Sequence, residues 1–270
     1  MTLDLVAREG LVLLGCGKMG TALLTGWLAA GVPATSVWVI EPNPTDWLKS
    51  CGAHLNAGIP PKPAVAVIAV KPQIMGAALP ALQALGNGTT LFVSIAAGTS
   101  IASFATAFGA QTPIVRTMPN TPAMVGRGIT GICGNVQAGA AGLAVARALM
   151  LAVGEVVELD GEHQIDAVTG VSGSGPAYVF HLIEAMAAAG MAQGLSEPMA
   201  MQLARATVCG AGELAYQSTD TAAQLRINVT SPAGTTAAAL AVLMDPETGF
   251  PPLLARAVKA ATTRGRELGQ

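Results

Sequence analysis

The stretch GLVLLGCGKMGTALLTGW, residues 10 to 27, decides how the first half of this chain folds. Residues 11 to 14 are an apolar run with the length and composition of a strand buried on both faces. Glycines follow at 15, 17 and 20, and a helix is predicted to begin among them. A strand, a tight turn and a helix in this order make an anion site, because the helix N-terminus presents free N–H groups.

The glycine turn has the features of a site for the pyrophosphate of a dinucleotide. Gly15 permits a tight turn, and Gly17 lets the backbone approach a phosphate at the start of the helix near Lys18. Met19 and Gly20 complete the turn. The alternative is a turn with a purely structural role. The order of the strands and an acid further along the chain favour the dinucleotide.

That acid is Glu41, which ends the second predicted strand. A carboxylate at this place accepts hydrogen bonds from the adenosine ribose and repels a 2′-phosphate, which favours NADH over NADPH. The alternative is a solvated loop carboxylate. Asn43 and Lys49 are near enough in the sequence to reach a phosphate, and no arginine lies between residues 41 and 50.

Short apolar runs rich in Val and Ile alternate with helix-like stretches in the first half of the chain. Such runs predict strands buried on both faces of a parallel sheet with right-handed crossovers. The predicted strands are 11–15, 36–42, 64–72, 89–98, 112–120, 128–134 and 154–160. Residues 1–161 are therefore predicted to form a doubly wound α/β domain.

Two further segments close strands at the edge where such sheets bind ligands. Val70, Lys71 and Pro72 end one strand, and Ala97 lies in the segment that ends the next. Both segments are predicted to wall the cofactor groove. For Lys71, a solvated or ion-paired side chain is an equal alternative.

The second half of the chain has a different pattern, with long Ala, Leu and Met stretches at helical spacing. Helices are predicted at about 176–193, 197–217, 235–243 and 251–267. Residues 162–270 are therefore predicted to form an all-helical domain that follows the first without a flexible linker.

Composition argues against several classes of function. Charged residues are 11% of the 270, the net charge is −2, and hydrophobic residues are 51%. This leaves no basic patch for nucleic acid, and so little charge suggests that another subunit covers part of the surface. Glycines interrupt the apolar segment from residue 11 to 32, and no basic leader precedes it. We therefore expect a cytoplasmic protein with no membrane span.

The cysteines are widely separated and have no histidine at metal-ligand spacing. This spacing predicts neither a metal site nor a disulfide, and we expect the cysteines to be small buried side chains. They are Cys16, Cys51, Cys133 and Cys209.

Five motifs, taken in order, resemble the pyrroline-5-carboxylate reductase family. They are GCGKMG (15–20), AVKPQ (69–73), MPNTP (118–122), SGSGPAY (172–178) and VTSPAGTT (229–236). Members of this family use NADPH or NADH to reduce the C=N bond of 1-pyrroline-5-carboxylate to L-proline, the last step of proline biosynthesis. The resemblance implies a Rossmann-like domain and a helical domain that forms a homodimer, which in many members assembles into larger rings.

The resemblance also implies a substrate site at the start of the predicted helix 235–243. Ser231, Ala233, Gly234 and Thr235 would bind the substrate carboxylate through backbone N–H groups and hydroxyls, without Arg or Lys. Thr236 is the candidate catalytic residue, with a hydrogen bond to the ring nitrogen. The alternative is that the threonines only cap the helix.

Further residues are assigned to the nicotinamide. Met118, Pro119 and Asn120 are implied to form the loop against its ring, with Met118 also facing the substrate. Asn228 is a candidate partner for its carboxamide. The SGSGPAY segment is expected to be structural.

Two positions depart from the family pattern. Ala233 stands where a glycine is usual, which costs about 1 kcal/mol or more if its φ is positive. Ile227 stands where many members have an acid, so a role for that acid cannot be transferred. Because of these departures, one alternative function is a non-catalytic nucleotide sensor. A second alternative is another reductase with the same two-domain plan, although a β-hydroxyacid dehydrogenase would have a lysine near residues 170–178, where none occurs.

Overall fold

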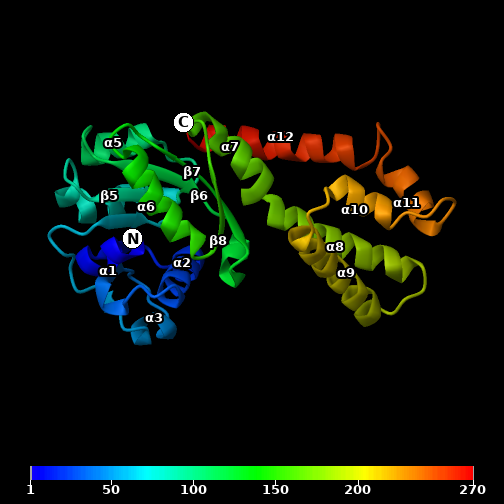
Figure 1. Ribbon diagram of the computed structural model, residues 1–270, viewed down its shortest axis with the longest axis horizontal. Coiled ribbons are helices and arrows are strands. Elements are labelled where there is room, and N and C mark those ends of the chain that lie inside the picture. Colours follow the sequence, from blue (N-terminus) through cyan, green and yellow to red (C-terminus); the bar gives the residue numbers. More distant parts are fainter. Residues whose placement is uncertain (1, 270) are drawn as a thin grey trace. The chain divides into compact units, whose positions relative to one another are not determined.

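The computed structural model describes residues 2–269, which fall into two compact units (Figure 1). The first unit contains the chain up to Gly173 and the stretch from Ala261 onward, and the second contains Ser174–Ala260. The change from strand-like to helical pattern predicts the domain boundary earlier, between residues 161 and 162. Among the described residues, no helix is both long and apolar enough to cross a membrane.

One sheet, with strand order β3-β2-β1-β4-β5-β6-β7-β8, forms the centre of the first unit. Its strands are β1 (Leu11–Leu14), β2 (Val37–Ile40), β3 (His54–Leu55), β4 (Val65–Ile68), β5 (Leu91–Ser94), β6 (Ile114–Met118), β7 (Gly128–Gly134) and β8 (Gly154–Glu158). β1, β2, β4, β5 and β6 are parallel, so their carboxyl ends share one edge. This confirms the Rossmann-like α/β sheet.

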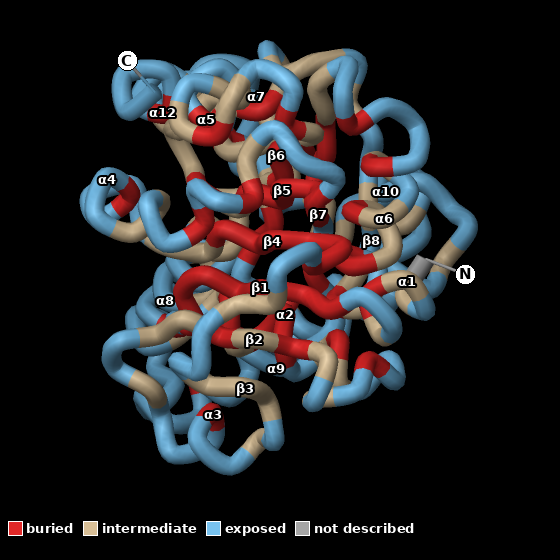
Figure 2. Tube along the Cα trace, turned by 90° about the vertical axis from the view of Figure 1, so that its left-hand side faces the viewer, coloured by how far each residue is buried: buried red, intermediate tan, exposed pale blue. Residues whose placement is uncertain are grey.

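Helices cover both faces of the sheet. They are α1 (Thr2–Glu9), α2 (Lys18–Ala29), α3 (Asp46–Ser50), α4 (Met75–Ala78), η3 (Leu79–Leu85), α5 (Ile101–Phe108), α6 (Gly139–Leu151) and α7 (Ile165–Val168). Leu11 and Leu13 pack with α1, α2 and α6, whereas Val12 and Leu14 pack with α4, η3 and α5. Successive side chains of a strand point to opposite faces, so the apolar run of β1 serves both layers. Figure 2 shows the buried residues along the central strands.

The sheet differs from the prediction at its two ends. β7 is antiparallel to β6, and only η4 (Thr121–Val125) lies between them. A parallel crossover needs a dozen or more residues, so this short connection reverses the chain instead. β8 is largely exposed and not buried on both faces as predicted. The two-residue β3 was not predicted, because it is too short to show a pattern.

The second unit is helical, as predicted. Its helices are α8 (Gly175–Ala192), α9 (Glu197–Gln217), α10 (Ala222–Asn228), α11 (Thr235–Leu243) and α12 (Phe250–Leu268), the last of which continues into the first unit. α10 was not predicted, since seven residues give little periodicity. The buried cluster of this unit contains only Ala187, Ala200 and Ala204. Large apolar side chains such as Phe180, Leu203 and Val242 are exposed.

An ion pair between a buried arginine and a half-buried glutamate, whose side chain is 31% exposed, joins the sheet to the segment that leads out of the first unit. Arg116 on β6 donates from Nη1 to Glu162 Oε1 at 2.7 Å, and its side chain is 8% exposed. The same oxygen accepts the backbone N–H of Ile101 at the start of α5, at 2.8 Å. Glu162 thus binds two elements at once, because a carboxylate oxygen can accept more than one hydrogen bond.

Replacing Arg116 should destabilise the protein far more than replacing an exposed arginine. Arg116→Ala leaves the half-buried Glu162 without its cation, so the free energy of unfolding should fall by about 2 kcal/mol in urea titrations. The matched control is Arg264→Ala, whose ion pair with Glu267 spans 2.8 Å but is 67% and 53% exposed. That substitution should cost less than about 1 kcal/mol. Equal losses in the two variants would contradict this assignment.

Candidate active site

The glycine turn forms an open cradle in front of α2. Gly15 has φ +89°, and a Cβ there would lie 2.8 Å from Val70 Cγ1. A Cβ on Gly20 would lie 2.5 Å from the Gly15 carbonyl oxygen. At Gly17, the N-cap of α2, a Cβ would meet no described atom within 4 Å. The turn therefore packs tightly on its inner side and leaves space at the helix N-terminus, which fits the pyrophosphate of a dinucleotide.

Glu41 lies directly beside this turn. Its Oε2 accepts the backbone N–H of Cys16 at 2.8 Å, and its Oε1 accepts the backbone N–H of Asn43 at 2.9 Å. The structure therefore brings Glu41, Asn43 and the glycine turn together. Glu41 thus has fixed backbone contacts beside the turn, and its contact with a ribose stays a prediction.

The other residues predicted for the cofactor follow the strands next to β1. Val70 is half-buried, while Lys71 and Pro72 are exposed at the end of β4. Ala97 is half-buried in the segment after β5. Lys18 is exposed on α2. It lines a hollow of about 310 Å³ between α2 and η4, which the four residues above do not line.

The loop after β6 is held from two directions. Asn120 is buried, its Nδ2 donates to the Ser172 carbonyl oxygen at 3.1 Å, and its Oδ1 accepts the Ile129 N–H at 2.9 Å. A Cβ on Gly173 would lie 2.8 Å from Met118 Cε. The SGSGPAY motif thus positions the Met118–Asn120 loop, a contact that sequence reasoning missed because nothing local signals it.

The residues predicted for the substrate carboxylate lie in the second unit. Gly234 is the N-cap of α11, and this helix has no side-chain cap. Gly234 N–H donates to the Ser231 carbonyl oxygen at 3.1 Å, which closes the turn. Thr235 is exposed and Thr236 half-buried in the first turn of the helix. The alternative that these threonines only cap α11 is therefore not what the structure shows.

Two further positions of this segment are informative. Ala233 has φ +57°, so the backbone strain expected for a non-glycine residue is present. Asn228 ends α10 with both polar atoms of its side chain bonded: Oδ1 accepts from Gln224 at 2.7 Å, and Nδ2 donates to Asp220 Oδ2 at 3.3 Å. Ile227 is 55% exposed.

The cysteines divide into two groups. Cys16 and Cys133 are buried, as expected, and burial raises the pKa of the Cys16 thiol and raises that of Cys133 to about 11. Neither is thus a ready nucleophile at neutral pH. Cys51 is half-buried, and Cys209 is exposed, so the expectation of burial is wrong for Cys209.

Comparison with known proteins decides the family. The model for pyrroline-5-carboxylate reductase dimerisation matches residues 162–268, and the model for NADP oxidoreductase, coenzyme F420-dependent, matches residues 11–98. Pyrroline-5-carboxylate reductase from Pseudomonas aeruginosa is 41% identical over 263 residues, covering 95% of this chain and 96% of that protein. The chain belongs to the pyrroline-5-carboxylate reductase family.

Solved structures of pyrroline-5-carboxylate reductases share this fold along nearly the whole chain. The Coxiella burnetii structure has a TM-score of 0.90 at 32% identity, and the match covers 97% of this chain and 99% of that one. The Plasmodium falciparum structure, which has NADP bound, has a TM-score of 0.83 at 28% identity and the same coverage. These matches confirm the combination of a Rossmann-like sheet with a helical dimerisation domain.

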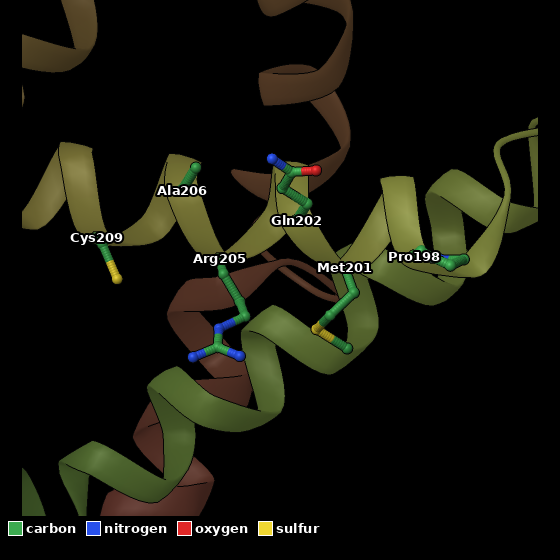
Figure 3. A pocket seen from close by; sticks show the side chains of 6 residues that line it. All are labelled: Pro198, Met201, Gln202, Arg205, Ala206 and Cys209. Carbon is green, nitrogen blue, oxygen red and sulfur yellow. The ribbon is translucent and has the colours of Figure 1, made fainter.

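One face of α9, in the part of the chain that matches the dimerisation model, lines a hollow (Figure 3). This hollow of about 530 Å³ is lined by Pro198, Met201, Gln202, Arg205, Ala206 and Cys209. Intervals of three and four residues place these side chains on one face of the helix. The hollow contains none of the predicted site residues and lies in the part of the chain that matches the dimerisation model, so we predict that it packs against the second subunit.

Glycine at position 233 should stabilise the protein. Ala233→Gly removes the left-handed strain, so the free energy of unfolding should rise by about 1 kcal/mol. The matched control is Ala238→Gly, an exposed site within α11, where the same change should cost about 1 kcal/mol. Both are measured by urea unfolding at one protein concentration. A loss of stability in both variants would show that the strain at Ala233 is relieved in solution.

A charge on the exposed face of α9 should weaken the dimer. Ala206→Arg places a guanidinium where a second subunit packs, so the dimer Kd should rise at least about tenfold in sedimentation experiments. Ala141→Arg, at an exposed alanine on α6 of the first unit, should leave the Kd unchanged. An unaltered dimer in Ala206→Arg would remove this face from the interface.

Proposed function

We propose that this protein reduces the C=N bond of 1-pyrroline-5-carboxylate to L-proline with NADPH or NADH, the last step of proline biosynthesis. The observation that carries the proposal is the glycine cradle, open at Gly17, in a chain whose family relationship spans both units. The reduced nicotinamide, when bound, supplies the hydride. The protein has to position the reactants and neutralise the substrate carboxylate.

The first unit would hold the cofactor along the edge where β1, β2, β4, β5 and β6 end. The turn from Gly15 to Gly20 receives the pyrophosphate on the N-terminus of α2, and Glu41 with Asn43 lies at the adenosine ribose. Val70, Lys71, Pro72 and Ala97 wall the groove. The Met118–Asn120 loop packs against the nicotinamide, and its rigidity supports this role, because Asn120 is bonded on both sides.

The second unit would hold the substrate. The first turn of α11 has backbone N–H groups without a side-chain cap, and Ser231, Ala233, Gly234 and Thr235 surround it, so a carboxylate can bind there without Arg or Lys. Thr236 would hydrogen-bond the ring nitrogen of the imine and of the product amine. A protonated cyclic imine already accepts hydride well, so no strong acid is required. A contact of Asn228 with the nicotinamide carboxamide would replace its bonds to Gln224 and Asp220.

We further propose that the homodimers associate into a larger ring and that the protein works in the cytoplasm. The exposed Phe180, Leu203 and Val242 of the helical unit support extensive subunit contacts, because one monomer seldom exposes so much apolar surface. The mass of the particle in sedimentation experiments tests this assembly.

Removing the Thr236 hydroxyl should slow the reaction. Thr236→Val keeps the shape but loses one hydrogen bond, so kcat/KM for the imine should fall roughly 10- to 100-fold. Thr236→Ser, which restores a hydroxyl, should recover most of the activity. The control Thr106→Val changes an exposed threonine of α5 and should have no effect. Unchanged kcat/KM in Thr236→Val would exclude the catalytic role.

The reaction itself is tested with racemic 1-pyrroline-5-carboxylate and either NADH or NADPH. Loss of reduced-nicotinamide absorbance, together with proline identified in the product, is the expected result. Cofactor binding without turnover would instead indicate a nucleotide sensor, the alternative that the departures from the family pattern at Ile227 and Ala233 suggest. Turnover of other cyclic imines but not of this one would leave another imine reductase.

A further inference from the structure

The side chain of Asn56 continues the hydrogen bonding between β3 and β2 by one more residue pair. β3 pairs with β2 only through His54 and Leu55, and the backbone N–H of Asn56 then donates to the Val39 carbonyl oxygen at 2.8 Å. Beyond this point the Asn56 amide replaces the backbone: Oδ1 accepts the Glu41 N–H at 3.0 Å, and Nδ2 donates to the Glu41 carbonyl oxygen at 2.9 Å. Its φ of +50° turns the chain away, a conformation that asparagine adopts more readily than most residues.

Glu41 is consequently held at four points. Asn56 binds both of its backbone polar groups, while the N–H groups of Cys16 and Asn43 bind its two carboxylate oxygens. The carboxylate therefore lies against the glycine turn in one orientation. An ionised carboxylate has about four acceptor positions, so it can still accept hydrogen bonds from a ribose.

The loop that follows has one basic side chain, and it forms an exposed ion pair with an acid of the same loop. Within residues 41–50 the only basic residue is Lys49, and its Nζ is 2.9 Å from Asp46 Oδ1. Together with Glu41 these residues carry a net charge of −1. A phosphate at this place would meet a fixed negative charge, whereas a ribose 2′-hydroxyl would meet a hydrogen-bond acceptor.

We propose that Asn56 is a positioning residue for cofactor selectivity: by bracing the backbone of Glu41 it fixes the Glu41 carboxylate where the protein accepts NADH and discriminates against NADPH. The inference rests on the proposed function, which places the cofactor at this edge. It adds a residue outside the turn, Asn56, that enforces the distinction between the two cofactors predicted from Glu41.

Binding of NADH and NADPH, measured separately by titration calorimetry without substrate, tests the proposal. The wild type should bind NADH roughly tenfold or more tightly than NADPH. Glu41→Gln removes the charge at constant shape and should tighten NADPH binding, so that the preference falls to within about threefold. Asn56→Gly removes the brace without left-handed strain and should shrink the preference through weaker NADH binding.

The chain offers a matched control for Asn56. Asn87 also has positive φ, at +53°, and its Oδ1 also accepts a backbone N–H, from Gln111 at 3.0 Å. Asn87 precedes β5, so it lies at the amino ends of the parallel strands and not at their carboxyl ends, where the cofactor is proposed to bind. Asn87→Gly should therefore change stability but not the ratio of the two affinities. KM for each cofactor should follow the affinities in every variant, and Asn87→Gly should leave kcat for the imine unchanged.

The binding results distinguish a failure of the proposed function from a failure of the cofactor selectivity. If neither cofactor binds the wild type, the proposed function fails together with the selectivity. If both bind and NADPH binds as tightly as NADH or more tightly, the selectivity proposal is overturned and the function stands. An affinity ratio in Glu41→Gln equal to that of the wild type removes Glu41 as the determinant. Equal ratios in Asn56→Gly and Asn87→Gly remove Asn56 as its brace.

Discussion

The close approach of α2 to the end of β1 is the constraint on which the first unit depends. A side chain at Gly20 would collide with the Gly15 carbonyl oxygen, and one at Gly15 would collide with Val70 and with the Ala69 carbonyl oxygen. Because glycine has only a hydrogen atom as its side chain at both positions, the first turn of α2 packs directly on the chain that leaves β1. Its free N–H groups then face the edge where the parallel strands end. A larger residue at either position would push the helix away and remove the anion site.

The groups around this edge stabilise the fold and shape the site at the same time. The Glu41 carboxylate bonds the glycine turn, Asn120 bonds the Ser172 carbonyl oxygen and β7, and Glu162 joins β6 to α5. Each of these side chains links segments far apart in the chain. Contacts that the fold itself requires therefore also fix the predicted cofactor segments, which would lower the cost of holding a reactive geometry.

The helical unit is built on a different principle. Its own buried cluster consists of three alanines, and its large apolar side chains remain on the surface of a single chain. The stability of such a unit is coupled to association, since the partner subunit supplies the apolar contacts that the monomer lacks. It also carries a left-handed alanine within the predicted carboxylate site, and strained residues of this kind cluster at functional sites.

The sequence alone was sufficient for the features that local pattern encodes. The apolar runs located seven of the strands, helical spacing located α8, α9, α11 and α12, and the glycine pattern located the turn between β1 and α2. The tertiary structure alone decided the antiparallel β7, the ion pair of Arg116 with Glu162 and the brace that Asn56 forms on Glu41. Local periodicity reflects which side of an element is buried, whereas these pairings depend on which distant segments the folded chain brings within hydrogen-bonding distance.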